Sequence, residues 1–140
     1  MGKEVKQPTV VIADADAAFR DMVRQRLGGS AVVAEAPDGK QAIRLAGELQ
    51  PDVVLMDLEL PEIDGLAATH WIKAERPETC VILLTTHNEE AYLSATGKSG
   101  ADAFLPKKNV RLGVLAIVKA AVRGFQGGWD GRERRRQEAR

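Results

Sequence analysis

Seven polar residues with the chemistry of a phosphoryl or metal site stand directly after short apolar runs of this 140-residue sequence. Carboxylates, hydroxyls and ammonium groups gathered in one place can hold a hard cation such as Mg²⁺ beside a phosphoryl group, and Ca²⁺ is the alternative if more protein oxygens take part. The residues are Asp14 and Asp16 after the first run, Asp57 after the third, Thr85 and Thr86 after the fourth, and Lys107 and Lys108 after the fifth.

The apolar runs recur at intervals that leave room for a helix between consecutive strands. They start at residues 10, 31, 53, 81 and 103, and three of them are continuous in Val, Ile and Leu, as in strands covered on both faces of a parallel sheet. Apolar residues at helical spacing predict helices over about 18–27, 39–49, 66–76, 89–99 and 110–125, the fourth with the weakest apolar face. The pattern therefore predicts an α/β fold with a single doubly wound (βα)5 parallel five-stranded sheet, which binds ligands at the carboxyl ends of its strands.

Composition limits the chain to one domain with a short tail. Basic and acidic residues balance at 20 each, but residues 132–140 carry a net charge of +3, which leaves −3 on the rest. That acidic body lacks the basic face that nucleic-acid binding needs.

The sequence also lacks an apolar run long enough to span a membrane and an apolar leader, so we expect a cytoplasmic protein. We expect its domain to cover 8–125 and a linker or Arg-rich tail to cover 126–140.

The segment from Pro51 to Leu66 resembles the receiver domain of bacterial two-component response regulators. Asp57 matches the phosphoacceptor of that family, Pro61 follows four residues later, and Asp64 and Gly65 follow at seven and eight. Further matches are Thr85, the segment 100–102 (Gly-Ala-Asp), Phe104 and Lys107. The resemblance covers about residues 8–125 and implies a flavodoxin-like fold with strand order 2-1-3-4-5.

The resemblance also implies a chemistry for each matched residue. Asp57 would take a phosphoryl group from a sensor histidine kinase or a phosphotransfer protein, while Lys107 and Thr85 contact the phosphoryl oxygens. The Mg²⁺ ligands would come from Asp14, Asp16, Asp57 and the main-chain carbonyl of Glu59.

The family also implies a switch. Thr85 and Phe104 would move on phosphorylation and change the face formed by the fourth helix, the fifth strand and the fifth helix. That face would act on an output domain or protein or form a homodimer. Such a domain is not an enzyme beyond promoting its own phosphorylation and dephosphorylation.

Two departures from the family pattern leave a second function open. The family has adjacent acids after its first strand, but here Ala15 takes the place of the acid that binds metal directly, with Asp16 as a substitute one residue later. The family commonly has Lys-Pro after the fifth strand, whereas Pro106 precedes Lys107 here, which makes Lys108 a second candidate for the ammonium. A pseudo-receiver that works as an interaction module without phosphorylation is therefore the alternative.

A third interpretation comes from the strand that ends in Asp-Ala-Asp. It resembles the first motif of haloacid-dehalogenase-type phosphatases, with Asp14 as nucleophile and Asp16 as general acid. Those enzymes need more chain, and the match around Asp57 would go unexplained. Asp16 could also be no more than the N-cap of the first helix.

Overall fold

The computed structural model describes residues 7–86 and 99–124, and these form a parallel sheet flanked by helices. The strands are β1 (Thr9–Ala13), β2 (Val32–Ala36), β3 (Val53–Asp57), β4 (Cys80–Thr85) and β5 (Ala103–Pro106). The helices are α1 (Ala17–Leu27), α2 (Gly39–Leu49), α3 (Gly65–Glu75) and α5 (Lys107–Val122), with a short 3-10 turn η1 (Gly28–Ser30) after α1.

The five strands are all parallel and lie in the order β2-β1-β3-β4-β5. This confirms the predicted doubly wound, flavodoxin-like sheet. The strand order reverses at β1, which has β2 on one side and β3 on the other. In open α/β sheets a ligand crevice forms at that reversal, outside the carboxyl ends of the strands.

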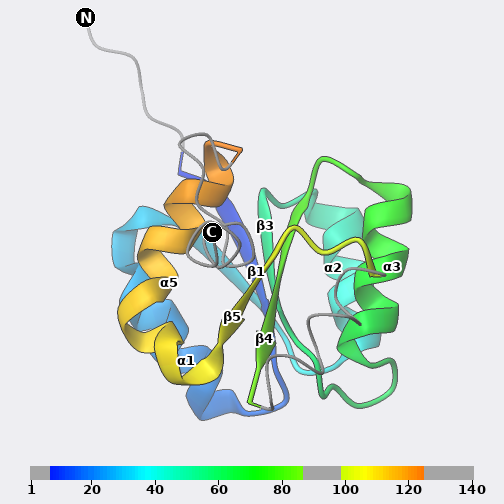
Figure 1. Ribbon diagram of the computed structural model, residues 1–140, viewed down its shortest axis with the longest axis horizontal. Helices are drawn as coiled ribbons and strands as arrows, with labels where there is room; N and C mark the ends of the chain where they lie inside the picture. Colours follow the sequence, from blue (N-terminus) through cyan, green and yellow to red (C-terminus); the bar gives the residue numbers. More distant parts are fainter. Residues whose placement is uncertain (1–6, 87–98, 125–140) are drawn as a thin grey trace, which may run out of the picture.

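Helices cover both faces of the sheet (Figure 1). The helices α1 and α5 pack on one face and α2 and α3 on the other, as Figure 1 shows. Alternate strand residues face the two layers: Val10 and Ile12 join the core under α1 and α5, whereas Val11 and Ala13 join the core under α2 and α3. All residues of β3 and β4 are buried, which explains their continuous apolar sequences.

The first three β-to-α connections end in an aspartate that caps the next helix. The carboxylates of Asp16, Asp38 and Asp64 accept hydrogen bonds from the backbone N–H groups of Ala18, Gln41 and Ala67 respectively. Each bond satisfies a donor that the first helical turn leaves unpaired. These caps fix where each helix leaves the sheet edge.

Helix α5 begins earlier than the sequence predicted. We expected it to start at Val110 after a loop, but it starts at Lys107, directly after Pro106 closes β5. Proline has no N–H to continue a strand ladder, and its ring fixes φ at a value that suits the residue before a helix, so no separate loop is needed. The helix ends at Val122, and the predicted last residue, Phe125, lies outside the described residues.

Two further predictions concern residues that the structure does not describe. Most of the predicted fourth helix (89–99) and all of the proposed linker or tail (126–140) lie outside 7–86 and 99–124. Within the described part of the chain, no helix is both long and apolar enough to span a membrane.

Candidate functional site

Four of the predicted site residues come from neighbouring strands and stand at the same edge of the sheet. Asp14 follows β1, Asp57 is the last residue of β3, Thr85 is the last residue of β4, and Lys107 follows β5. The strand register pairs Ala13 with Met56, Asp57 with Leu84 and Thr85 with Pro106, so the carboxyl ends of β1, β3, β4 and β5 lie side by side at one edge of the sheet. Parallel pairing therefore brings together side chains that lie far apart in the sequence.

Lys107 links the two aspartates of this edge. Its Nζ lies 2.6 Å from Oδ2 of Asp14 and 3.3 Å from Oδ2 of Asp57. The same ammonium stands 4.5 Å from the ring centroid of Phe19 on α1, a cation-π contact. Lys108, the other candidate, is exposed. Lys107 therefore reaches both carboxylates, and the Pro106-Lys107 order does not prevent this.

Burial and the neighbouring charges shift the pKa values of Asp57 and Lys107. Burial raises the pKa of Asp57, and the neighbouring charge of Asp14 raises it further, while Lys107 acts in the opposite direction. Burial alone would lower the pKa of Lys107, but its hydrogen bond to Asp14 and the charges of both carboxylates outweigh burial, so the pKa of Lys107 is raised. Two anions thus share one cation, and Asp57 is the carboxylate for which ionisation is disfavoured.

The loop after Asp57 is held close to the strand by a glycine. A Cβ on Gly65 would stand 2.1 Å from the main-chain oxygen of Asp57 and 2.8 Å from Cα of Leu58, so no other residue fits there without moving backbone. The N–H of Gly65 donates to the carbonyl of Leu58 at 2.9 Å. Asp57 Oδ1 lies 3.4 Å from the backbone nitrogen of Glu59, which donates to it. The Asp64-Gly65 pair therefore shapes the peptide next to the phosphoacceptor candidate.

Asp14 and Asp16 have different surroundings. Asp14 is 1% exposed, and its Oδ1 accepts a hydrogen bond from the N–H of Asp16 at 2.8 Å. Its Oδ2 is a buried side-chain oxygen that, within the described residues, has no hydrogen bond besides the ion pair with Lys107. Asp16 is exposed, and its Oδ1 accepts from the N–H of Ala18 at 2.9 Å. Asp16 thus acts as a helix cap, and its service as a metal ligand stays a prediction.

The two threonines and the aromatic residue differ in exposure. Thr85 is 3% exposed and Phe104 is 5% exposed, whereas Thr86 is exposed. Phe104 pairs with Leu83 across β4 and β5 and belongs to the apolar core on the α2 and α3 side. Its ring therefore already occupies an inward position.

The donor set at this edge fits Mg²⁺ better than a cation that needs many protein ligands. In residues 7–86 and 99–124, no group of three His, Cys, Asp or Glu side chains is placed to hold a metal ion. Asp14 and Asp57 do share one ammonium, and within these residues the buried Asp14 Oδ2 meets only that ammonium. Mg²⁺ is commonly bound by one or two carboxylates and keeps several waters. Two carboxylates and a main-chain oxygen are sufficient for such an ion.

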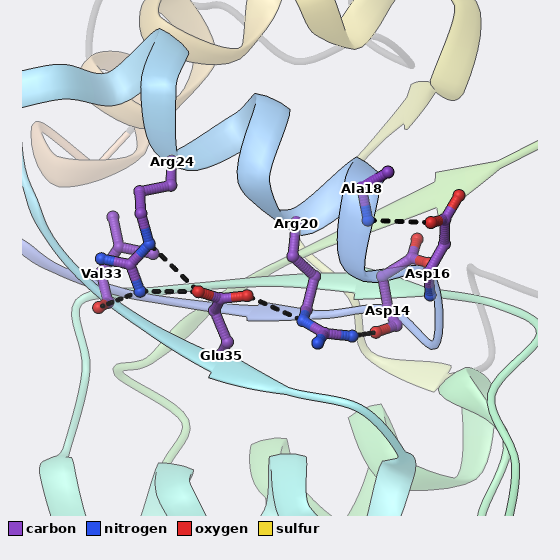
Figure 2. A network of polar contacts seen from close by, with 7 residues as sticks. All are labelled: Asp14, Asp16, Ala18, Arg20, Arg24, Val33 and Glu35. Atoms are coloured by element: carbon purple, nitrogen blue, oxygen red, sulfur yellow. Dashed lines mark hydrogen bonds and ion pairs between the residues drawn. The ribbon is translucent and has the colours of Figure 1, made fainter.

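A polar network behind Asp14 was not predicted from the sequence (Figure 2). Arg20 on α1 donates from Nε to Oε1 of Glu35 on β2 at 2.8 Å and from Nη1 to the main-chain oxygen of Asp14 at 2.6 Å. Arg24, one turn later, donates from Nη2 to Oε2 of Glu35 at 2.8 Å and to the carbonyl of Val33 at 3.3 Å. The available signal was weak: two arginines four residues apart and one acid inside an apolar strand.

Asp102, part of the matched Gly-Ala-Asp segment, lies in a second ion pair away from this edge. Its Oδ2 accepts from Nζ of Lys73 and from the N–H of Val81, both at 2.8 Å. Lys73 also donates to the carbonyls of Pro77 and Thr79. This contact joins the end of α3 to β4 and to the start of β5, so we assign Asp102 a structural role.

Comparison with known proteins places this geometry in a family. The family model described as "Response regulator receiver domain" matches residues 10–119. The transcriptional regulatory protein YdfI of Bacillus subtilis is 42% identical over 93 residues, which cover 66% of this chain and 43% of that protein. The transcriptional regulatory protein DegU of Brevibacillus brevis is 32% identical over 118 residues, which cover 82% of this chain and 50% of that protein. The chain thus spans about half the length, or less, of these relatives.

Solved structures agree with these matches. The signal receiver domain of NarL from Mycobacterium tuberculosis superposes with a TM-score of 0.80 at 31% identity, covering 86% of this chain and 99% of that chain. A two-component response regulator of the LuxR family from Aurantimonas superposes with a TM-score of 0.77 at 30% identity, covering 85% of this chain and 87% of that chain. The matches do not favour the phosphatase interpretation, in which Asp14 would be the nucleophile.

Proposed function

This chain belongs to the response regulator receiver family, and from that premise we propose that Asp57 accepts a phosphoryl group from a sensor histidine kinase or a phosphotransfer protein. One observation carries the proposal: Asp57 and Asp14 meet at the ammonium of Lys107 at the carboxyl edge of the sheet. A phosphoryl group on Asp57 would enter a site that already holds a cation.

The transfer needs an aligned carboxylate more than a strong base. An oxygen of Asp57 forms a bond to phosphorus while the bond from phosphorus to the donor imidazole nitrogen breaks, and that nitrogen keeps the electron pair. The product is an acyl phosphate on Asp57. Because a carboxylate is a weak nucleophile, positioning and charge neutralisation supply the rate. Lys107 would pair with a phosphoryl oxygen, and Thr85 is the candidate hydrogen-bond donor to another.

Mg²⁺ would be held by Asp14, Asp57 and the main-chain carbonyl of Glu59, with waters completing its shell. Bound there, the ion supplies positive charge that offsets the repulsion between carboxylates and phosphoryl oxygens. This role is supported by the shared ion pair and by the raised pKa of Asp57, whose causes are burial first and then the charge of Asp14. Asp16 stays a predicted fourth ligand, which would have to leave its capping position to join the others.

The decisive test uses acetyl phosphate as the donor. We expect stoichiometric, Mg²⁺-dependent labelling of the whole chain, measured by intact-mass spectrometry, and its loss in Asp57→Asn. The matched control is Asp21→Asn, which removes an exposed carboxylate on α1. Turnover of a chromogenic phosphate ester that is lost in Asp14→Asn would instead support the phosphatase. Labelling that survives Asp57→Asn would contradict the proposal.

Signal output is proposed to depend on Thr85 and Phe104. Because the Phe104 ring is already buried, phosphorylation is expected to stabilise an existing inward position rather than to create it. Fluorine NMR of the chain labelled with fluorophenylalanine measures this equilibrium. We expect beryllofluoride with Mg²⁺ to shift the Phe104 resonance toward a single buried environment, and no shift would contradict this part of the proposal.

A second candidate function is favoured by Ala15. It stands where the resemblance places a direct metal ligand, and the next acid, Asp16, caps α1. A pseudo-receiver would keep the fold and the Lys107 ion pairs and bind a partner without phosphorylation. Absence of both labelling by acetyl phosphate and spectral change with beryllofluoride at high Mg²⁺ would support this candidate.

The remaining proposals concern the organisation and partners of the protein. We propose a receiver domain over 8–125, a linker or Arg-rich tail over 126–140, and a cytoplasmic location without membrane contact. The receiver domain itself is proposed not to contact nucleic acid directly. The proposed partners are a kinase or phosphotransfer protein and an output domain or protein. A homodimer would use β5, α5 and the segment between β4 and β5. Relatives named as transcriptional regulators support an output step in transcription.

A further inference from the structure

Three elements of the fold meet at one guanidinium behind the site. Arg20 projects from α1, and its Nε donates to Glu35 on β2 while its Nη1 donates to the main-chain oxygen of Asp14 after β1 (Figure 2). The Arg20 side chain is 15% exposed. Arginine presents its donors in a rigid planar fork, so holding one side of the fork sets the direction of the other. The contact with Glu35 therefore aims Nη1 at Asp14.

Glu35 is itself held from both sides. Its Oε1 accepts from Arg20 and its Oε2 accepts from Nε and Nη2 of Arg24, at 3.1 and 2.8 Å. Hydrogen bonds from Arg20 first and Arg24 second lower the pKa of Glu35, so it remains ionised at neutral pH. A permanently charged acceptor keeps the Arg20 fork in one orientation.

The consequence for Asp14 is that nearly every polar atom of this residue is fixed. Its N–H donates to the carbonyl of Ala36 at 3.0 Å, its carbonyl accepts from Arg20 at 2.6 Å, and its Oδ1 accepts from Asp16 at 2.8 Å. Among the contacts within residues 7–86 and 99–124, Oδ2 is the atom of Asp14 left to face the site, where it meets Lys107. With Ala15 unable to contribute a ligand, the orientation of this one buried carboxylate matters more than in a site with two adjacent acids.

We propose that Arg20 is a positioning residue for the metal and phosphoryl site, acting through the main-chain carbonyl of Asp14, with Glu35 as the anchor that directs its guanidinium. This inference rests on the proposed function of Asp14 and Asp57. Arg20 touches neither the phosphoryl group nor the metal. Its effect is that Asp14 Oδ2 is already directed into the site before a ligand arrives, which lowers the entropic cost of binding.

The test is a Mg²⁺ titration of the whole chain followed by proton-nitrogen NMR. We expect Arg20→Ala to raise the half-saturating Mg²⁺ concentration by about tenfold, the lower end of the range for residues that orient metal ligands. The matched control is Arg24→Ala, which removes an arginine of the same helix bound to the same Glu35 but in contact with Val33 instead of Asp14. We expect this control to weaken Mg²⁺ binding much less than Arg20→Ala does, because Arg20 keeps its own contacts with Glu35 and Asp14.

A second variant separates positioning from folding. Arg20→Lys keeps the charge, but one ammonium cannot maintain the forked contact with Glu35 and Asp14 together, so we expect a weaker Mg²⁺ affinity at nearly parental stability in urea. If the arginine variants lose Mg²⁺ affinity only in proportion to lost stability, or if Arg20→Ala binds Mg²⁺ like the parent, the inference is wrong.

Parallel labelling with acetyl phosphate distinguishes this failure from that of the proposed function. A parent chain that binds Mg²⁺ but takes no label overturns the proposed function, and the titration still decides the role of Arg20. A labelled parent whose Arg20→Ala variant shows parental Mg²⁺ affinity overturns the positioning role alone. A parent chain that does not bind Mg²⁺ overturns both.

Discussion

Lys107 is paired more closely with Asp14 than with Asp57: its Nζ lies 2.6 Å from the first carboxylate and 3.3 Å from the second. The same lysine is the first residue of α5, so the start of that helix is tied to the ends of β1 and β3. An incoming phosphoryl group on Asp57 would compete with Asp14 for this ammonium. The resting ion pairs and the proposed signalling step therefore depend on the same cation.

Removing that cation should destabilise the fold at neutral pH. In Lys107→Met, two partly or fully buried carboxylates lose their shared counter-ion, and we expect a loss of about 2 kcal/mol in the free energy of unfolding at pH 7. The loss should shrink as the pH falls, because burial and the charge of Asp14 raise the pKa of Asp57, and protonated Asp57 no longer needs the counter-ion. Urea denaturation across this pH range measures both effects.

The control for this variant lies next to it in the chain. Lys108→Met removes an exposed lysine from the same helical turn, and we expect almost no change in stability. Equal losses for the two variants would show that the general charge of the α5 terminus matters, and not the contacts of Lys107 with Asp14 and Asp57.

Asp57 is expected to reduce stability at neutral pH. Its pKa in the folded chain is raised, by burial and then by Asp14, so the folded state holds this proton more tightly than the unfolded state does. The contribution of Asp57 to the free energy of unfolding is fully present below the ordinary aspartate pKa of about 4. It is lost as the pH rises through the raised pKa of Asp57 in the folded chain. Asp57→Asn, which cannot ionise, should therefore have a higher free energy of unfolding than the parent at pH 7.

This difference should vanish toward pH 3, where Asp57 is protonated in both states. Thermal or urea unfolding as a function of pH measures the crossover, with Asp21→Asn as the exposed control. A variant less stable than the parent at pH 7 would mean that the ion pair with Lys107 outweighs burial and the charge of Asp14.

Much of this architecture could be predicted because buried parallel strands have a distinctive composition. The Val- and Ile-rich runs located β1, β3 and β4, and the polar residues at their ends indicated the edge where Asp14, Asp57 and Lys107 meet. The ambiguity at Asp16 was different in kind, since a helix cap and a metal ligand both require an acid just after a strand. The contact of Asp16 with Ala18 shows the capping role, and the role as a metal ligand stays a prediction.

Two other features depended on tertiary geometry. Lys107 and Lys108 are adjacent residues of the same type. Which of them faces Asp14 depends on where α5 begins and how its first turn is rotated relative to the sheet. The contact between Arg20 and Glu35 joins a helix to a strand 15 residues later in the chain, and no local pattern encodes that approach. The start of α5 was misplaced because apolar periodicity reports the buried turns of a helix and not its polar first turn.

A glycine close to Asp57 should be irreplaceable for a steric reason. Gly65→Ala would place a Cβ 2.1 Å from the main-chain oxygen of Asp57, and backbone must move to relieve the clash. We expect a loss of at least about 3 kcal/mol in unfolding free energy, similar to severe overpacking, and impaired labelling by acetyl phosphate. Chemical denaturation and intact-mass labelling measure these two effects.

The control is another glycine within a helix. Gly47 in α2 is exposed, and a Cβ there would meet nothing within 4 Å. Gly47→Ala should therefore stabilise the chain by about 0.5–1 kcal/mol, the usual helix preference of alanine over glycine, without affecting labelling. A Gly65→Ala variant that behaves like Gly47→Ala would show that the loop after Asp57 is free to move.

Restoring an acid at position 15 should strengthen Mg²⁺ binding. Ala15 lies between the buried Asp14 and the helix cap Asp16, and it contributes no ligand. Ala15→Asp adds a carboxylate at the end of β1, and we expect the half-saturating Mg²⁺ concentration, measured by NMR titration, to fall by about tenfold, because affinity for hard cations rises with the number of charged oxygen ligands. Ala17→Asp adds the same charge at the exposed start of α1 and should have a much smaller effect. Equal gains for the two variants would indicate a general electrostatic field, and no gain in Ala15→Asp would indicate that Asp16 already provides the missing ligand.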